Sequence, residues 1–162
     1  MIADVTKKLV AGEPPASAEV EEVAVEMMSG DASPVQMAAF LTAMQMRGET
    51  VHILAAFARV MRARAVPFKR PEGVVLDTCG TGGDHSGTFN ISTGAALVAA
   101  GAGVKVAKHG NRSMTSKCGS ADVLAELGVR VDCDVRLMER ALEEVGICFL
   151  FAQQFHSSMR HV

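Results

Sequence analysis

The sequence predicts an α/β protein with a small N-terminal all-helical domain at residues 1–66 and a mainly parallel α/β domain at residues 70–162. Three observations support this prediction. Apolar residues recur at helical spacing through the first part of the chain. The segment from Pro67 to Pro71 ends that pattern. Beyond it, short apolar runs alternate with helical patterns, as expected for parallel strands joined by helical crossovers.

The helical domain is predicted from three segments. The first follows Ser17, carries acidic residues in its first turn and ends at Gly30. The second begins with Ser33 as cap, Pro34 in the first helical position and Gln36 completing a capping box. The third covers residues 51–64. The side chains expected to face inward are Met37, Phe40, Leu41, Met44, Ile53, Leu54, Phe57, Val60 and Met61.

The α/β domain is predicted from the alternation that follows. Strands are expected at residues 74–76, 104–107 and 147–151. Helices are expected at residues 92–101 and 120–127, the latter stopped by Gly128, and a further helix is capped by Asp134.

Composition excludes several classes of protein. Hydrophobic residues make up 49% of the 162, enough for a core, so the chain is not a disordered segment. The net charge of −2 and the absence of Trp and Tyr argue against nucleic-acid binding. The four cysteines form no C-x-x-C pair, which favours reduced thiols and a cytoplasmic location. We expect no signal peptide and no membrane segment.

A long polar loop covers residues 77–93, between the first predicted strand and the next helix. Its glycines let the backbone approach a ligand closely. Asn90, Ser92 and Thr93 stand where the helix begins, and helix amides, helix dipole and hydroxyls together predict a phosphate site. No Lys follows the glycines, and His85 stands where a dinucleotide fingerprint requires Gly, so nucleoside triphosphates and nicotinamide cofactors are disfavoured.

A second loop covers residues 108–120 and concentrates positive charge. It carries or adjoins Lys105, Lys108, Arg112 and Lys117, with no acid between residues 85 and 121. This pattern predicts binding of a small polyanion. Individual roles stay open. His109 is either a structural histidine or a general base, and Arg112 either binds the ligand or pins the loop through a carboxylate such as Asp84; for Asp77 we favour a loop anchor.

At these two loops the sequence resembles the anthranilate phosphoribosyltransferase family. The matching text is Asp-Thr-Cys-Gly-Thr-Gly-Gly-Asp from Asp77, Gly-Thr-Phe-Asn-Ile-Ser-Thr from Gly87, Lys-His-Gly-Asn-Arg from Lys108 and Gly-Ser-Ala-Asp-Val-Leu from Gly119. The resemblance implies the fold of the nucleoside phosphorylase and phosphoribosyltransferase relatives. It also implies transfer of phosphoribose from phosphoribosyl pyrophosphate to the amine of anthranilate in tryptophan biosynthesis, with Mg²⁺ as cofactor and a homodimer formed through the helical domain.

The resemblance also implies roles for individual residues, with no dedicated nucleophile or certain general base among them. Gly80 and Asn111 face anthranilate, and Ser92 contacts the magnesium ion. Thr115 replaces the serine more usual in the family but keeps the hydroxyl. The residues implied to bind phosphoribosyl pyrophosphate are Gly80, Gly83, Asp84, Thr88, Asn90, Ile91, Ser92, Thr93, Lys108, His109, Gly110, Asn111, Arg112, Ser113, Met114, Thr115, Ser116 and Ser120.

One departure from the family concerns length. Relatives continue beyond the position that matches Val162, with an arginine that contacts anthranilate and an Asp-Glu pair that binds magnesium. The resemblance therefore implies that this chain is the N-terminal half, that it holds only the first part of the α/β domain with an incomplete sheet, and that it has little activity alone.

Three rival functions remain at this stage. The first is a nucleoside phosphorylase of the same fold, which would use phosphate as the incoming group. The second is a non-catalytic relative that binds nucleic acid, although acids and bases are equally frequent beyond residue 68. The third is a helical dimerisation module with a vestigial site.

Overall fold

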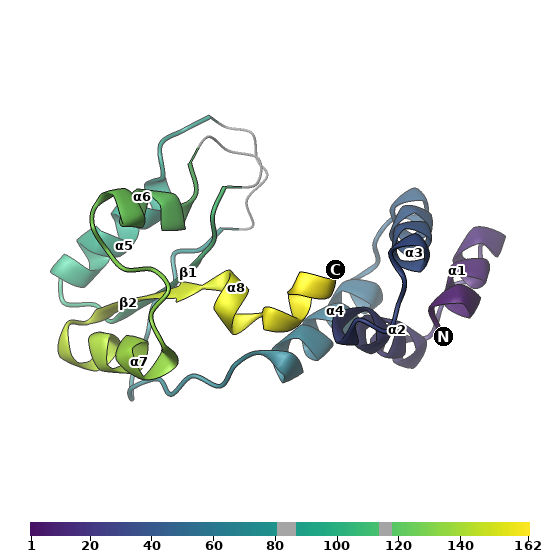
Figure 1. Cartoon of the computed structure of the whole chain (residues 1–162), viewed down its shortest axis with the longest axis horizontal. Helices are drawn as coiled ribbons and strands as arrows, with labels where there is room; N and C mark the ends of the chain where they lie inside the picture. The colour runs from purple at the N-terminus through teal and green to yellow at the C-terminus, as the bar shows by residue number, and fades with distance from the viewer. Residues whose placement is uncertain (81–86, 114–117) are drawn as a thin grey trace. The chain divides into compact units, whose positions relative to one another are not determined.

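The computed structural model describes residues 1–80, 87–113 and 118–162 (Figure 1). Two compact units divide the chain. A helical unit comprises residues 1–65 together with 156–162, and an α/β unit comprises residues 66–155. Within the described residues, no helix has both the length and the apolar character needed to cross a membrane.

The helical unit contains four α-helices and a short 3₁₀ segment, with bounds α1 Ile2–Ala11, α2 Ser17–Ser29, α3 Pro34–Arg47, α4 Val51–Arg64 and η1 Ser157–His161. The predicted start of α3 is confirmed: the Gln36 amide donates to Ser33 Oγ at 3.3 Å, and the Ser33 amide donates to Gln36 Oε1 at 2.9 Å. Gly30 ends α2 at φ 80°, a left-handed conformation in which glycine has no Cβ penalty.

Helix α1 was missed by the sequence analysis. Its signal is the spacing of Ile2, Val5 and Leu9, which are all buried in the core of the unit. The helix also has an unusual C-terminal cap from another element. The Arg47 guanidinium, at the end of α3, donates to the carbonyl of Leu9 at 2.7 Å and to that of Val10 at 2.8 Å. The Val10 carbonyl, which a helix end leaves without an intrahelical partner, is satisfied in this way, and the Leu9 carbonyl gains a second donor besides the Gly12 amide at 3.1 Å.

The core of the helical unit is built around Phe40, which is 1% exposed and lies 6.2 Å, ring to ring, from Phe57. Two predicted inward residues are placed differently. Leu54 is 56% exposed, and Leu41 lies at the margin of exposure. The helical period alone does not settle such positions, because the width of the buried stripe depends on how many neighbours a helix has. At its end the chain returns to this unit, where Met159 packs against the core formed by Ala24, Met28 and Val60.

The described part of the α/β unit contains two strands and four helices, with bounds α5 Ile91–Gly101, β1 Val106–Gly110, α6 Ser120–Glu126, α7 Val135–Glu144, β2 Ile147–Phe151 and α8 Ala152–Phe155. The two strands are parallel and pair in register from Val106 with Ile147 to Gly110 with Phe151. The predicted parallel arrangement and the open, incomplete sheet are therefore confirmed. The predicted cap of α7 is also present, because the Leu137 amide donates to Asp134 Oδ1 at 2.9 Å.

The first predicted strand, at residues 74–76, is reduced to one bridge. Leu76 donates to the Lys105 carbonyl at 2.8 Å and accepts from the Ala107 amide at 2.9 Å, which makes an isolated parallel bridge with Val106. Val74 is 84% exposed and pairs with neither strand. The prediction of a buried strand there was wrong in extent, since no second layer covers Val74. The bridge still places β1 between Leu76 and β2.

The two faces of the sheet are covered by different helices, as Figure 1 shows for α6 and α7. Phe149 and Phe151 of β2 pack with Ala121 and Leu124 of α6. Cys148, the residue before Phe149 on the strand, packs instead with Met138 and Leu142 of α7. Side chains that alternate between the faces of a strand produce this division. The loops that follow Leu76 and β1 thereby emerge at one end of the sheet, where ligands of open α/β sheets bind.

Candidate functional site

Asp77 joins the beginnings of the two polar loops. Its Oδ1 accepts the Cys79 amide at 2.9 Å and the His109 amide at 3.2 Å. Backbone amides that point at one carboxylate hold both chain segments in place. The interpretation of Asp77 as a loop anchor agrees with this geometry, although its side chain lies in an exposed rather than a buried position.

The start of α5 is organised by Asn90. Its Oδ1 accepts the Thr93 amide at 3.3 Å, the Thr93 hydroxyl at 2.8 Å and the Ser92 hydroxyl at 3.3 Å. Thr78 adds a bond from its hydroxyl to the Ser92 carbonyl at 2.8 Å, which ties the first loop to this turn. The Ile91 amide donates to the Phe89 carbonyl at 2.7 Å. An anion at this helix start would therefore compete with bonds that the chain makes to itself.

Lys108 brings a buried positive charge to this turn. The residue is 2% exposed, and Nζ donates to Ser92 Oγ at 3.3 Å and to the His109 carbonyl at 3.4 Å. Burial lowers the pKa of Lys108, while neighbouring Cys79 and Asp77 oppose that shift. Among the described residues, Lys108 bonds only neutral oxygens, and a buried cation in such surroundings is costly unless something else compensates it. The arrangement therefore favours an anionic partner next to Ser92.

Cys79 and His109 meet beside this lysine. Cys79 Sγ lies 3.7 Å from His109 Nδ1. Burial raises the pKa of the Cys79 thiol and Asp77 raises it further, whereas Lys108 lowers it. A raised pKa keeps the sulfur in its neutral thiol form, which is a poor nucleophile. Cys79 is therefore not an activated nucleophile in this arrangement.

The second loop is closed at its base. The Asn111 carbonyl accepts the Ala121 amide at 3.1 Å, and Asn111 Oδ1 accepts the Arg112 amide at 2.9 Å. Arg112 pairs with Asp122 at 3.2 Å, and its guanidinium also lies 6.0 Å from the centre of the Phe151 ring. The loop-pinning interpretation of Arg112 thus has a partner, but it is Asp122, to which the sequence analysis assigned no role.

Two glycines of the site show opposite environments. A Cβ on Gly80 would meet no atom of the described residues within 4 Å, which agrees with a backbone that faces a ligand. A Cβ on Gly110 would lie 2.8 Å from the Phe149 ring and 2.9 Å from Ser120 Cβ. Gly110 is therefore needed for close packing, and that packing holds Ser120 against the end of β1.

The structure thus brings most of the predicted residues to one end of the sheet. Thr88 lies on the exposed approach to α5, and Ser120 forms the first residue of α6. Three residues that lie among them were not predicted as site residues, namely Thr78, Cys79 and Asp122. Their position inside the matching motifs was the sequence feature that could have identified them. The predicted residues Gly83, Asp84, Met114, Thr115 and Ser116 lie outside the described residues.

The described part of the chain offers no cluster of three or more His, Cys, Asp or Glu side chains that could hold a metal ion. The oxygen that suits magnesium is the Ser92 hydroxyl. Magnesium keeps several waters and commonly binds one or two protein oxygens together with substrate phosphates. A single hydroxyl next to the candidate phosphate site fits that mode of binding.

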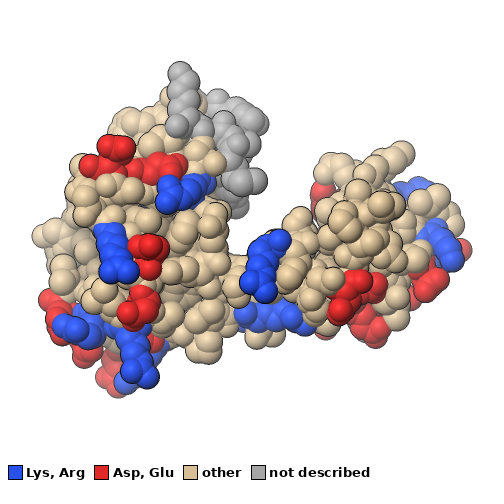
Figure 2. Space-filling view, viewed as in Figure 1, with Lys and Arg blue, Asp and Glu red and all other residues tan. Residues whose placement is uncertain are grey.

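Charges on the visible face of the α/β unit are mixed, with Lys and Arg next to Asp and Glu (Figure 2). A nucleic-acid track would need a continuous basic stripe. The positive charge of the site is instead local and partly buried at Lys108.

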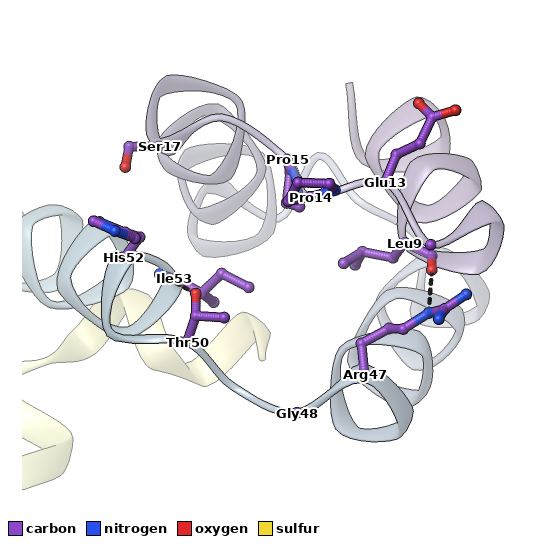
Figure 3. Close-up of a pocket in the computed structure, with 11 residues that line it drawn as sticks. Leu9, Glu13, Pro14, Pro15, Ser17, Arg47, Gly48, Thr50, His52 and Ile53 are labelled. Carbon is purple, nitrogen blue, oxygen red and sulfur yellow. Dashed lines mark hydrogen bonds between the residues drawn. The ribbon is translucent and has the colours of Figure 1, made fainter.

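A pocket of about 510 Å³ lies elsewhere, within the helical unit (Figure 3). It lies between the α1–α2 connection, at Pro14 and Pro15, and the α3–α4 connection, with Leu9 and Ile53 lining it. Arg47, at the edge of the pocket, donates a hydrogen bond to the Leu9 carbonyl. No predicted site residue belongs to this pocket.

Comparisons with known proteins match both units. A family model described as "Glycosyl transferase family, helical bundle domain" matches residues 3–65, and one described as "Glycosyl transferase family, a/b domain" matches residues 72–162. An anthranilate phosphoribosyltransferase of Pelotomaculum thermopropionicum is 56% identical over the whole chain, and one of Moorella thermoacetica is 54% identical over 95% of it. The chain spans 47% and 45% of these relatives, so about half of their length.

Solved structures give the same family. The crystal structure of anthranilate phosphoribosyltransferase from Thermus thermophilus is 48% identical, with a TM-score of 0.88 over 98% of this chain and 48% of that one. The enzyme from Saccharomyces cerevisiae in complex with PRPP and Mg is 28% identical, with a TM-score of 0.86 over 99% of this chain and 49% of that one. This chain therefore belongs to the glycosyl transferase family, with the family's helical bundle domain followed by its α/β domain.

Proposed function

We propose that this chain supplies the phosphoribosyl-donor site of an anthranilate phosphoribosyltransferase. The enzyme would transfer phosphoribose from phosphoribosyl pyrophosphate to the amine of anthranilate and release pyrophosphate. The observation that carries the proposal is the buried Lys108 ammonium, which bonds the Ser92 hydroxyl at the start of α5. The relatives and solved structures named above support the identity of the donor.

The reaction needs little covalent help from the protein. The bond between C1 of the ribose and the pyrophosphate oxygen breaks, and its electron pair leaves with pyrophosphate. The anthranilate nitrogen forms the new bond to C1 and loses one proton. We assign no side chain to that proton, because none of the contacts described above singles out a base. The work of the site is to hold the leaving group and orient the amine.

Roles of the residues follow from where their side chains lie. Lys108 would neutralise charge that develops on the leaving pyrophosphate, and Ser92 would contribute one oxygen to Mg²⁺, which when bound adds further positive charge there. Arg112 and Ser113 would bind the donor from the second loop. Gly80, and Asn111 opposite the start of α6, would face anthranilate.

The test is a calorimetric titration of the chain with phosphoribosyl pyrophosphate in the presence of Mg²⁺. A second titration under the same conditions follows the chemical shifts of the backbone amides by NMR. Binding is expected to perturb amides of residues 87–93 and 108–113. A nucleoside with inorganic phosphate serves as the competing ligand pair, because a nucleoside phosphorylase would bind those instead. Binding of that pair in place of the donor would overturn the proposal.

We also propose that the protein forms a homodimer through its helical unit and works in the cytoplasm. Large apolar side chains lie exposed on that unit, among them Val35, Met46 and Val51, each at least 79% exposed. A second copy that covered these side chains would remove apolar surface from water, which favours association. None of the four cysteines, all of which are described residues, forms a disulfide, which agrees with a reducing compartment. Light scattering on the purified chain should give the mass of two copies; a monomer at micromolar concentration would contradict the dimer.

A further inference from the structure

The second loop narrows where residues 111–113 pass close to Gly119, and we call this place the loop neck. Its two sides approach so closely at Gly119 that a Cβ there would overlap the Ser113 nitrogen and would lie 2.5 Å from the Arg112 carbonyl carbon and 2.6 Å from the Asn111 oxygen. All three are backbone atoms, so no side-chain movement could relieve the overlap. Close backbone approach of this kind accounts for a glycine in this position.

One carboxylate closes this neck. Asp122 Oδ2 accepts the Ser113 amide at 3.0 Å and the Gly119 amide at 2.9 Å, one from each side. The other oxygen, Oδ1, accepts a bond from Arg112 Nη1 at 3.2 Å. The amide bonds from Ser113 and Gly119 lower the pKa of Asp122, with the Arg112 pair adding to the effect.

We propose that Asp122 is a positioning residue of the donor site, which fixes Arg112 and Ser113 by joining the two sides of the neck with a single carboxylate. The inference rests on the proposed function, because it matters only if those two residues bind the donor. Asp122 itself is placed in the first turn of α6 and would not touch the donor.

The two oxygens of Asp122 have different partners, which allows their roles to be separated. In Asp122→Asn the remaining carbonyl oxygen can still accept both backbone amides, while the amide nitrogen faces Arg112 as a second donor. Asp122→Ala removes both sets of bonds. A matched control is Asp134→Ala, which removes a carboxylate that caps α7 of the same unit through the Leu137 amide.

The experiment titrates the full chain with phosphoribosyl pyrophosphate and Mg²⁺ by calorimetry, for the parent and the three variants. In parallel, hydrogen exchange of the Ser113 and Gly119 amides is followed without ligand. Asp122→Ala should weaken donor binding by about tenfold or more and speed exchange of both amides, because charged hydrogen bonds are lost. Asp122→Asn should lie between parent and Asp122→Ala in affinity. Asp134→Ala should bind as the parent does.

The possible failures can be told apart. If Asp122→Ala binds as tightly as the parent, or if Asp134→Ala weakens binding equally, the positioning role is wrong while donor binding stands. If the parent chain does not bind the donor although both amides exchange slowly, the proposed function fails, and the positioning role fails with it. If both amides exchange rapidly in the parent, the neck itself is wrong.

Discussion

The helical unit and the α/β unit differ in what they bury. Among the residues that the structure describes, the only buried polar or charged ones are Thr93 and Lys108, and both belong to the α/β unit. The described buried residues of the helical unit are all apolar. Burial of a polar or charged group costs free energy unless hydrogen bonds compensate it. The comparison teaches that this chain keeps its energetically unfavourable groups in the unit that carries the candidate site.

The largest expected effect tests the apolar side of this comparison. Phe40→Ala should lower the free energy of unfolding by about 3–5 kcal/mol, because it leaves a cavity in the core of the helical unit. Denaturant unfolding followed by circular dichroism would measure it. The control is Leu41→Ala, whose side chain lies at the margin of exposure. Equal losses from the two changes would show that the core is not centred on Phe40.

The buried cation gives the converse test. Lys108→Met should weaken binding of phosphoribosyl pyrophosphate about 100-fold, the loss expected for a charged hydrogen bond in a dry site. It should leave the free energy of unfolding unchanged or raise it, because the lowered pKa of Lys108 shows that burial disfavours its charged form. Calorimetry and denaturant unfolding measure the two quantities.

Lys105→Met, a change on the approach to β1, is the control for charge and should bind nearly as the parent does. A large loss of stability in Lys108→Met, together with unchanged binding, would mean that the lysine is a structural element and not part of a donor site.

Two helix caps sharpen the comparison further. Ser33 caps α3 and Asn90 caps α5, so replacing either by Ala should cost about 1 kcal/mol of stability. Only Asn90→Ala should also weaken donor binding, by about tenfold, because Asn90 orients the hydroxyls of Ser92 and Thr93. Thermal unfolding and calorimetry on both variants check this. Unchanged donor binding in Asn90→Ala would reduce that residue to an ordinary cap.

The smallest effect concerns acid pH. The folded pKa of Asp122 lies below its ordinary value of 3.8, so its stabilising contribution is fully present above pH 3.8 and is lost as the pH falls through the folded pKa. The stability difference between the parent and Asp122→Asn should therefore shrink below pH 3.8. Urea unfolding at several pH values measures it. A difference that stays constant with pH would contradict the bonds at the loop neck.

Local signals account for what could be predicted. The start of α3 followed from Ser33, Pro34 and Gln36, and the stop of α2 from Gly30, because caps depend on residues within one turn of each other. The short apolar run along β2 likewise predicted a strand at residues 147–151. A phosphate site at the start of α5 was predicted from a local pattern of this kind, whereas the roles of the individual loop residues follow from the family resemblance and stay predictions.

Tertiary contacts decided the rest. Sequence alone predicted α2 to α7, strands β1 and β2 and their parallel arrangement, but it missed α1 and α8 and predicted a full strand where Leu76 makes one bridge. It did not determine that Leu76 makes only one bridge, that Leu54 is exposed, or that Arg47 caps α1, because each depends on which elements become neighbours. The same holds for the bond from Lys108 to Ser92 and for the bonds from the Ser113 and Gly119 amides to Asp122. The roles of these two residues depend on burial and on partners distant along the chain, and local sequence propensity specifies neither.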